Sequence, residues 1–307
     1  MPPSSAPSSP PAHILVVGAT GKQGSAVLEA LERHPALQQR PSKLFALTRN
    51  PDSPRAKPLK ARGIKVVQGD IFDTDSLVTA LRHNAITAAF LVTDAFAKGG
   101  PDGERQQGIA FIDAAKRGGV EYIVFSSVGC ADTATQVPHF ASKNDIEHHL
   151  RDSGIPWAIL RPAAFMDNFP PSGIGRFLAF SLFGSLLGGR RKLQYVGVCD
   201  IGRVAAECLL KPSEFQGQTI ELSGDELTVP DIQKAWYRGT GTWPWKMWLP
   251  GSLLLPFMPY DFKMMFKFFI KDGYRANIKN LRTRFPGLKD FETWSRDEVA
   301  AKAKKQD

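Results

Sequence analysis

Six short apolar runs rich in β-branched residues recur along the first half of the chain, each followed by a segment of helix length. The runs are "HILVVG" (13–18), "KLFALT" (43–48), "IKVVQGD" (64–70), "ITAAFLVTD" (86–94), "EYIVFSS" (121–127) and "WAILRP" (157–162). This alternation is typical of a parallel sheet whose crossover helices cover both faces. Between the runs, apolar residues repeat with the helical period, as from Val27 to Leu31. The sequence therefore predicts an α/β fold built on a Rossmann-type, doubly wound parallel sheet.

The regular pattern weakens after Pro162, where Gly and Pro interrupt the apolar stretches. None of these stretches is an uninterrupted span of about 20 apolar residues, so we expect no transmembrane segment. We expect residues 13–162 to form the Rossmann domain. Residues 163–307 would mostly form a smaller, substrate-covering region, with some strands and helices returning to the first domain. The Pro/Ser-rich residues 1–12 read as a disordered tail rather than a targeting peptide.

The chain of 307 residues carries a net charge of +9, and much of the excess lies near its C-terminus. Beyond residue 240 there are 13 Lys or Arg against 7 Asp or Glu, scattered among aromatic residues. Scattered charge favours a solvated basic face over direct nucleic-acid binding. The alternative to a solvated face is that the basic residues attract a phosphate-bearing ligand or an anionic membrane surface. The segment "WLPGSLLLPFMP" (248–259) would make the membrane contact. The three cysteines lack metal-ligand spacing and cannot pair off evenly, which indicates a reducing compartment. We expect the cytoplasm, with the nucleus as an additional location.

The stretch "VVGATGKQG" carries the strongest chemical signal, because its glycines directly follow the first run and open the first helix. Glycines at this spacing allow a tight turn and close backbone approach to a pyrophosphate, which the helix N-terminus stabilises. It is not a Walker loop, since Lys22 is followed by Gln23. The alternative is a ligand-free turn. The predicted dinucleotide contacts are Gly18, Ala19, Thr20, Gly21, Lys22, Gln23 and Gly24.

The end of the second run, "LTRNP", predicts which dinucleotide is bound. A carboxylate at this place bonds the ribose 2′-hydroxyl of NAD, whereas an arginine accommodates the 2′-phosphate of NADP. Arg49 occupies the strand tip, and the nearest acid, Asp52, lies farther into the loop. The pattern favours NADP(H), with an ordinary loop arginine as the alternative.

Two further strand ends place candidate residues at the same edge of the sheet. After the third run, Asp70 can bond the adenine amino group while Ile71 packs on the ring. Alternatively, Asp70 caps the next helix, a role that Asp73 or Thr74 could also fill. After the fourth run, Val92 and Thr93 are expected beside the cofactor ribose.

Together, "GATGKQG", "TRNP", the "GD" of the third run, "HFASK" and "LRPAAFMDNF" resemble the NmrA-like family, an atypical branch of the short-chain dehydrogenases. The resemblance implies an NADP(H)-binding Rossmann domain and a smaller C-terminal region that closes over a cleft. It assigns the diphosphate loop to residues 18–24 and the 2′-phosphate contact to Arg49. It also assigns nicotinamide-side contacts to Lys143 and to Phe165, Met166, Asp167 and Asn168. Members of this family are reductases of quinones, dyes or natural-product intermediates, or sensors of NADP redox state.

Lys143 and His139 are the candidate catalytic residues, in the helix expected after the fifth run. Lys143 can bond the nicotinamide ribose and stabilise charge on a reacting oxygen, or it can merely pair with Glu147 one helical turn away. His139 stands where a typical short-chain dehydrogenase has the tyrosine that donates a proton. Ser126 and Ser127, at the tip of the fifth run, could orient a substrate oxygen or simply cap a turn.

The leading hypothesis is an NADP(H)-dependent oxidoreductase that passes hydride to a small hydrophobic or aromatic acceptor, such as a quinone, a ketone or a natural-product intermediate. The aromatic C-terminal segment would line the acceptor site or form a plain hydrophobic core. The alternative is a non-catalytic NADP redox sensor that regulates transcription through a protein partner. The missing tyrosine and the basic C-terminal quarter fit this second hypothesis.

Overall fold

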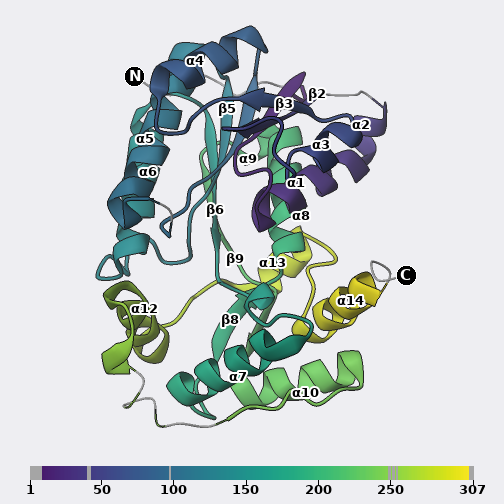
Figure 1. The fold of residues 1–307 in the computed structure, drawn as a ribbon, viewed down its shortest axis with the longest axis vertical. Helices are drawn as coiled ribbons and strands as arrows, with labels where there is room; N and C mark the ends of the chain where they lie inside the picture. The colour runs from purple at the N-terminus through teal and green to yellow at the C-terminus, as the bar shows by residue number, and fades with distance from the viewer. Residues whose placement is uncertain are drawn as a thin grey trace. The chain divides into compact units, whose positions relative to one another are not determined.

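A sheet of seven strands forms the centre of the first part of the chain (Figure 1). The computed structural model describes residues 9–39, 43–96, 98–247, 250, 253 and 255–303. The first eight residues of the expected tail lie outside this range, as does much of the 248–259 segment. The seven strands are β1 (His13–Val16), β2 (Lys43–Thr48), β3 (Lys65–Gln68), β4 (Ala88–Val92), β5 (Tyr122–Ser126), β6 (Trp157–Pro162) and β9 (Gln218–Leu222).

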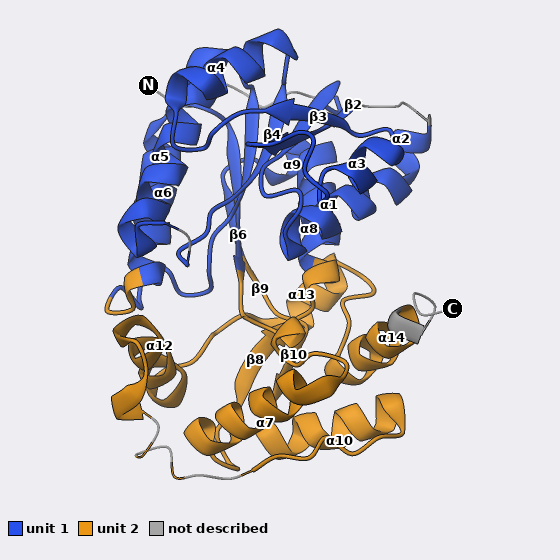
Figure 2. Cartoon of the chain, viewed as in Figure 1, with its two compact units in different colours: residues 1–135, 139–161, 201–220 blue, residues 136–138, 162–200, 221–307 orange. Residues whose placement is uncertain are grey.

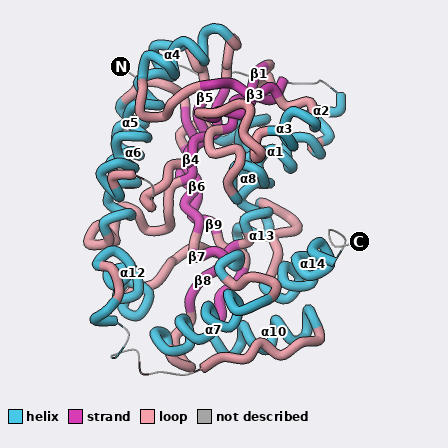
Figure 3. The backbone as a smooth tube through the Cα atoms, viewed as in Figure 1, coloured by secondary structure: helices cyan, strands magenta, loops and turns pink. Residues whose placement is uncertain are grey.

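The order of the strands is β3-β2-β1-β4-β5-β6-β9, and Figure 3 traces them in magenta. The pairings that join β3 through β6 are all parallel. Strand order reverses between β1 and β4, the point at which doubly wound sheets bind ligands. The predicted fold class is confirmed, and all six predicted runs contain a strand.

Helices cover both faces of this sheet (Figure 1). They are α1 (Lys22–Arg33), α2 (Pro35–Gln39), α3 (Lys57–Ala61), α4 (Thr74–His83), α5 (Gly100–Gly118), α6 (Pro138–Asp152), α8 (Val198–Leu210) and α9 (Pro212–Phe215). One face packs α4, α5 and α6 onto alternate strand residues such as Leu15, Ala89 and Ile123, all buried. Ile146 and Leu150 of α6 join this core, as their helical spacing predicts.

On the other face, α8 lies against α1 at Gly202. A Cβ atom at Gly202 would lie 2.5 Å from the Ala26 carbonyl oxygen, so the two helix backbones approach closely. Residues 201–220 thus belong to the same compact unit as residues 1–135 and 139–161 (Figure 2).

The second compact unit comprises residues 136–138, 162–200 and 221–307. A small sheet of order β10-β8-β7 is its framework. Its elements are β7 (Ala164–Phe165), η1 (Met166–Asn168), α7 (Gly173–Leu187), β8 (Leu193–Val196), β10 (Asp225–Leu227), α10 (Val229–Thr240), η2 (Leu255–Phe257), α12 (Tyr260–Lys271), α13 (Ile278–Arg284) and α14 (Phe291–Ala303). Along the described part of the chain, no helix combines the length and apolarity needed to cross a bilayer.

Aromatic residues form the core of this second unit. Phe169 packs on Phe180, Phe183 and Tyr195, with ring centroids 4.8 to 6.0 Å apart. Trp236 of α10 and Trp294 of α14 are almost completely buried, 6.3 Å apart. For these aromatic residues the plain hydrophobic core, rather than the lining of an acceptor site, is the interpretation that the structure supports.

Candidate functional site

The glycine turn after β1 has the backbone geometry of an anion cradle. Gly18 has a φ of +69°, which favours glycine, and its carbonyl accepts the Gly21 N–H at 2.9 Å. A Cβ atom at Gly24 would lie 2.2 Å from the Gly18 oxygen. Gly21 is the N-cap of α1, and no side chain caps this helix. A helix N-terminus without a side-chain cap is the kind of helix end that binds a ligand phosphate.

Side chains from two other strands hold this turn in place. Val92, at the end of β4, lies so close to Gly18 that a Cβ atom there would be 2.6 Å from its Cγ1. The buried Ser126 hydroxyl, at the end of β5, donates to Gln23 Oε1 at 2.6 Å. Predicted residues Val92 and Gln23 thus meet the turn through packing and a hydrogen bond. Ser126 therefore does not cap a helix or close a turn of its own, and its contact with a substrate oxygen stays a prediction.

Arg49 is exposed immediately after β2. Asp52 N–H bonds Asn50 Oδ1, and the Asp52 carboxylate accepts from Lys60 Nζ at 3.0 Å. The nearest acid is therefore engaged by a lysine, and the strand tip presents a cation. Among the described residues, Arg49 has no acidic partner, so its guanidinium is available to an anion.

Asp70 and Ile71 follow β3 and are both half-buried. The Asp70 carboxylate accepts the Phe72 N–H at 3.0 Å, which closes a local turn. Asp73, whose side chain accepts from Asp75 and Ser76, is the N-cap of α4. The capping alternative for Asp70 is therefore wrong, whereas its contact with adenine stays a prediction.

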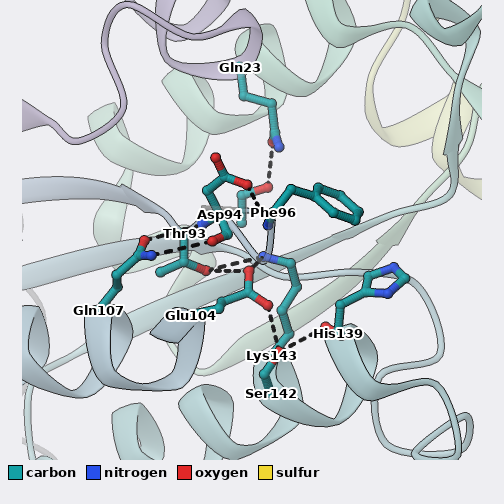
Figure 4. Close-up of polar contacts among 10 residues, drawn as sticks. Gln23, Thr93, Asp94, Phe96, Glu104, Gln107, His139, Ser142 and Lys143 are labelled. Atoms are coloured by element: carbon teal, nitrogen blue, oxygen red, sulfur yellow. Dashed lines mark hydrogen bonds and ion pairs between the residues drawn. The ribbon is translucent and has the colours of Figure 1, made fainter. Parts of the chain in front are cut away.

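Lys143 lies in a buried polar network drawn from three elements (Figure 4). Its Nζ atom donates to Glu104 Oε1 at 2.8 Å and to Thr93 Oγ1 at 3.2 Å. Thr93 Oγ1 donates to Glu104 Oε1 at 2.9 Å, and Ser142 Oγ donates to Glu104 Oε2 at 2.5 Å. The Glu104 side chain is 0% exposed and that of Lys143 is 12% exposed. This arrangement brings together two predicted residues, Thr93 and Lys143, around an acid that was not predicted.

The alternative partner of Lys143, Glu147, belongs to a different cluster. Both of its carboxylate oxygens accept from Arg161, at 2.9 and 2.7 Å, and one also accepts from Arg151. Asp132 also pairs with Arg161, at 2.9 Å. Burial works to lower the pKa of Arg161, but the hydrogen bonds and charges of Glu147 and Asp132 raise it above its usual range. The alternative for Lys143, a surface pair with Glu147, is therefore wrong.

His139 lies in the first turn of α6, which begins at Pro138, and Lys143 in its second turn. The imidazole is 8% exposed and packs edge-on against Phe140, with ring centroids 4.7 Å apart. Phe96, in the loop after β4, contacts it at 5.8 Å. Aromatic rings thus surround much of this side chain, and Figure 4 shows it pointing away from the Lys143 ammonium group.

The residues from Phe165 to Asn168 belong to the second unit. Met166 is fully buried and Asn168 is exposed. The Asp167 carboxylate accepts the Val198 N–H at 2.9 Å. Met166 therefore presents no exposed surface to a ligand, and the nicotinamide contacts of this segment stay predictions.

Glu104 could have been found in the sequence. It lies on the same helical face as Gly108, Phe111 and Ala115, which are four, seven and eleven residues further on and all buried. An acid in such a stripe needs a buried partner. The sequence therefore indicates that Glu104 is buried and paired, but it does not indicate which residue is the partner.

A glycine turn at the reversal point of a doubly wound sheet defines a Rossmann-type α/β protein with a dinucleotide-type site, and the largely buried Lys143 bonds Thr93, which follows β4. The sequence model of the NmrA-like family matches residues 10–294, and the chain belongs to this family.

Two relatives and one solved structure show what the chain is similar to. An NAD(P)H azoreductase from Xenophilus azovorans is 31% identical over 69% of this chain and 68% of its own. Quinone oxidoreductase 2 from Escherichia coli is 30% identical over the same shares of the two chains. Triphenylmethane reductase from Citrobacter sp., solved with NADP(H), has a TM-score of 0.74 and 19% identity, covering 93% of this chain and 99% of its own.

Proposed function

We propose that this protein is an NADP(H)-dependent oxidoreductase that reduces a small hydrophobic or aromatic acceptor. The observation that carries the proposal is the glycine turn, because it presents an uncapped helix N-terminus where the strand order reverses. Membership of the NmrA-like family and similarity to an azoreductase and a quinone oxidoreductase support it.

The described residues fit the cofactor. Residues 18–24 would hold the diphosphate, since the close packing at Gly18 and Gly24 leaves no room for a Cβ atom and so keeps this turn tight. Arg49 would pair with the 2′-phosphate, which favours NADP(H) over NAD(H). Asp70 and Ile71 would contact adenine, and Val92 and Thr93 would lie beside the ribose. When bound, NADPH supplies the hydride.

Lys143 would hold the ribose and stabilise negative charge on the acceptor. The aromatic packing around His139 supports only a minor role in proton transfer. A site without the usual tyrosine suits acceptors that need little help with protonation. Quinones and azo compounds, which the two relatives are named for, are therefore the acceptor classes that we propose.

The test is to mix purified protein with NADPH and a panel of quinones, azo dyes and aromatic ketones, and to follow absorbance of the reduced cofactor at 340 nm. We expect oxidation with at least one quinone or azo compound, and slower oxidation when NADH replaces NADPH. Tight NADPH binding without turnover of any panel member would instead support the redox-sensor alternative. Absence of binding to either dinucleotide would refute the proposal.

A further inference from the structure

The proposed function assigns no role to the buried Glu104 carboxylate. Glu104 lies on α5 and accepts hydrogen bonds from Thr93, which follows β4. It also accepts hydrogen bonds from Ser142 and Lys143 of α6. Its side chain is 0% exposed. Taking a carboxylate out of water is costly unless it is paired and hydrogen-bonded, and here three donors surround it. A buried ion pair adds little to the stability of the fold, since apolar residues that fill the same space would stabilise it as well.

The pair also fixes the direction of the Lys143 ammonium group. Nζ is held between Glu104 Oε1 and Thr93 Oγ1, and it lies 5.7 Å from the centroid of the Phe125 ring. An ammonium group has three N–H donors, so two of them are engaged and one remains for a ligand. The Glu104 carboxylate is the counter-charge of this ammonium group.

We infer that Glu104 is the positioning residue for Lys143, holding it as a fixed, charged hydrogen-bond donor toward the cofactor. Glu104 itself does not touch the cofactor, and Thr93 bridges the two charged groups. Lys143 therefore works as a hydrogen-bond donor toward the cofactor. The inference rests on the proposed binding of NADPH.

The chain offers a matched control in Glu147. Its carboxylate is also fully buried, and it lies one helical turn after Lys143, but it pairs with Arg161 and Arg151. Glu104→Gln and Glu147→Gln each remove one buried negative charge with little change in shape. Only the first removes the counter-charge of Lys143.

The experiment measures the Kd for NADPH by fluorescence titration, for each glutamine variant alone and combined with Lys143→Met. For Glu104→Gln alone we expect Kd to rise about tenfold, because the Lys143 donor loses the partner that directs it. In the Lys143→Met background Glu104→Gln should change Kd by less than about twofold, because no donor remains to be positioned. For Glu147→Gln the Kd should stay within about twofold in both backgrounds.

Equal losses for the two glutamine variants, or a loss of about tenfold from Glu104→Gln that persists in the Lys143→Met background, would overturn the inference while leaving the proposed function standing. Wild-type protein that binds no NADPH would overturn both. If Glu104→Gln does not fold, Glu104→Asp carries the test, because it keeps the charge but withdraws the carboxylate by one methylene group. We then expect Kd to rise about threefold or more, as the donor is displaced. An unchanged Kd for this variant would overturn the positioning role.

Discussion

Substituting Gly24 by alanine tests whether the glycine turn must let backbone approach backbone. The new methyl group would lie 2.2 Å from the Gly18 oxygen, 2.5 Å from the Gly18 carbon and 2.8 Å from Ala19 Cα. Comfortable contact needs about 3.5 Å, so the turn and α1 must separate by about 1 Å. All three neighbours are backbone atoms, which cannot rotate out of the way.

We expect this displacement to cost about 1–3 kcal/mol of unfolding free energy, as overpacking does. The N–H groups of the turn would move with it, so the Kd for NADPH should rise at least about tenfold, or about 1.4 kcal/mol. Urea unfolding measures the first quantity, and titration of NADPH fluorescence measures the second.

Gly63→Ala is the control. Gly63 has a φ of +78°, and a Cβ atom at this position would have no neighbour within 4 Å, so alanine there meets backbone strain but no steric clash. It should lose about 1–2 kcal/mol of stability with unchanged NADPH affinity. A Gly24→Ala protein that binds NADPH within twofold of the wild type would refute the reasoning, whatever its stability.

Three further outcomes are expected. Arg49→Glu should weaken NADPH far more than NADH, by about tenfold or more in Kd, because a charged hydrogen bond to phosphate is lost; equal losses would show that Arg49 does not read the 2′-phosphate. His139→Phe preserves ring packing, so NADPH oxidation should stay within about threefold of the parent rate, whereas a fall of about 10²-fold or more would reveal a general acid. Burial works to raise the pKa of Asp132, but the Arg161 hydrogen bond and charge lower it overall. A carboxyl with a lowered pKa stabilises the fold above its unfolded value, about 3.9, and this stabilisation is lost as pH falls through the folded value. Urea unfolding should therefore find Asp132→Asn less stable than wild type by up to about 1 kcal/mol at pH 7, since the carboxylate is half exposed. This gap should shrink as pH falls below about 3.9. A gap that keeps its full size well below that pH would contradict this.

Much of the fold could be predicted from the sequence because its signals are local. Six strands and the glycine turn depend on runs of neighbouring residues, and each lies where its run predicts. The short strands β7 and β10 were not predicted, because two or three residues carry no periodic signal.

The partner of Lys143 could not be predicted for a different reason. Glu147 lies one helical turn away in sequence, whereas Glu104 lies on another helix, 39 residues earlier. Helical spacing indicates only the Glu147 pairing, because Glu104 lies on a different helix. The choice follows from tertiary packing, because Arg161 on β6 takes Glu147 and leaves Glu104 for Lys143.

The return of α8 and β9 to the large sheet affects when the sheet can fold during synthesis and which fragments can fold. During synthesis, β6 has an unpaired edge until β9 has left the ribosome, so the sheet cannot be completed before residue 222. Such late, non-local pairing slows folding and prolongs exposure of the edge. An expression fragment that stops at Pro162 would keep that edge permanently and would leave α1 without its neighbour at Gly202. A soluble fragment should therefore extend past β9.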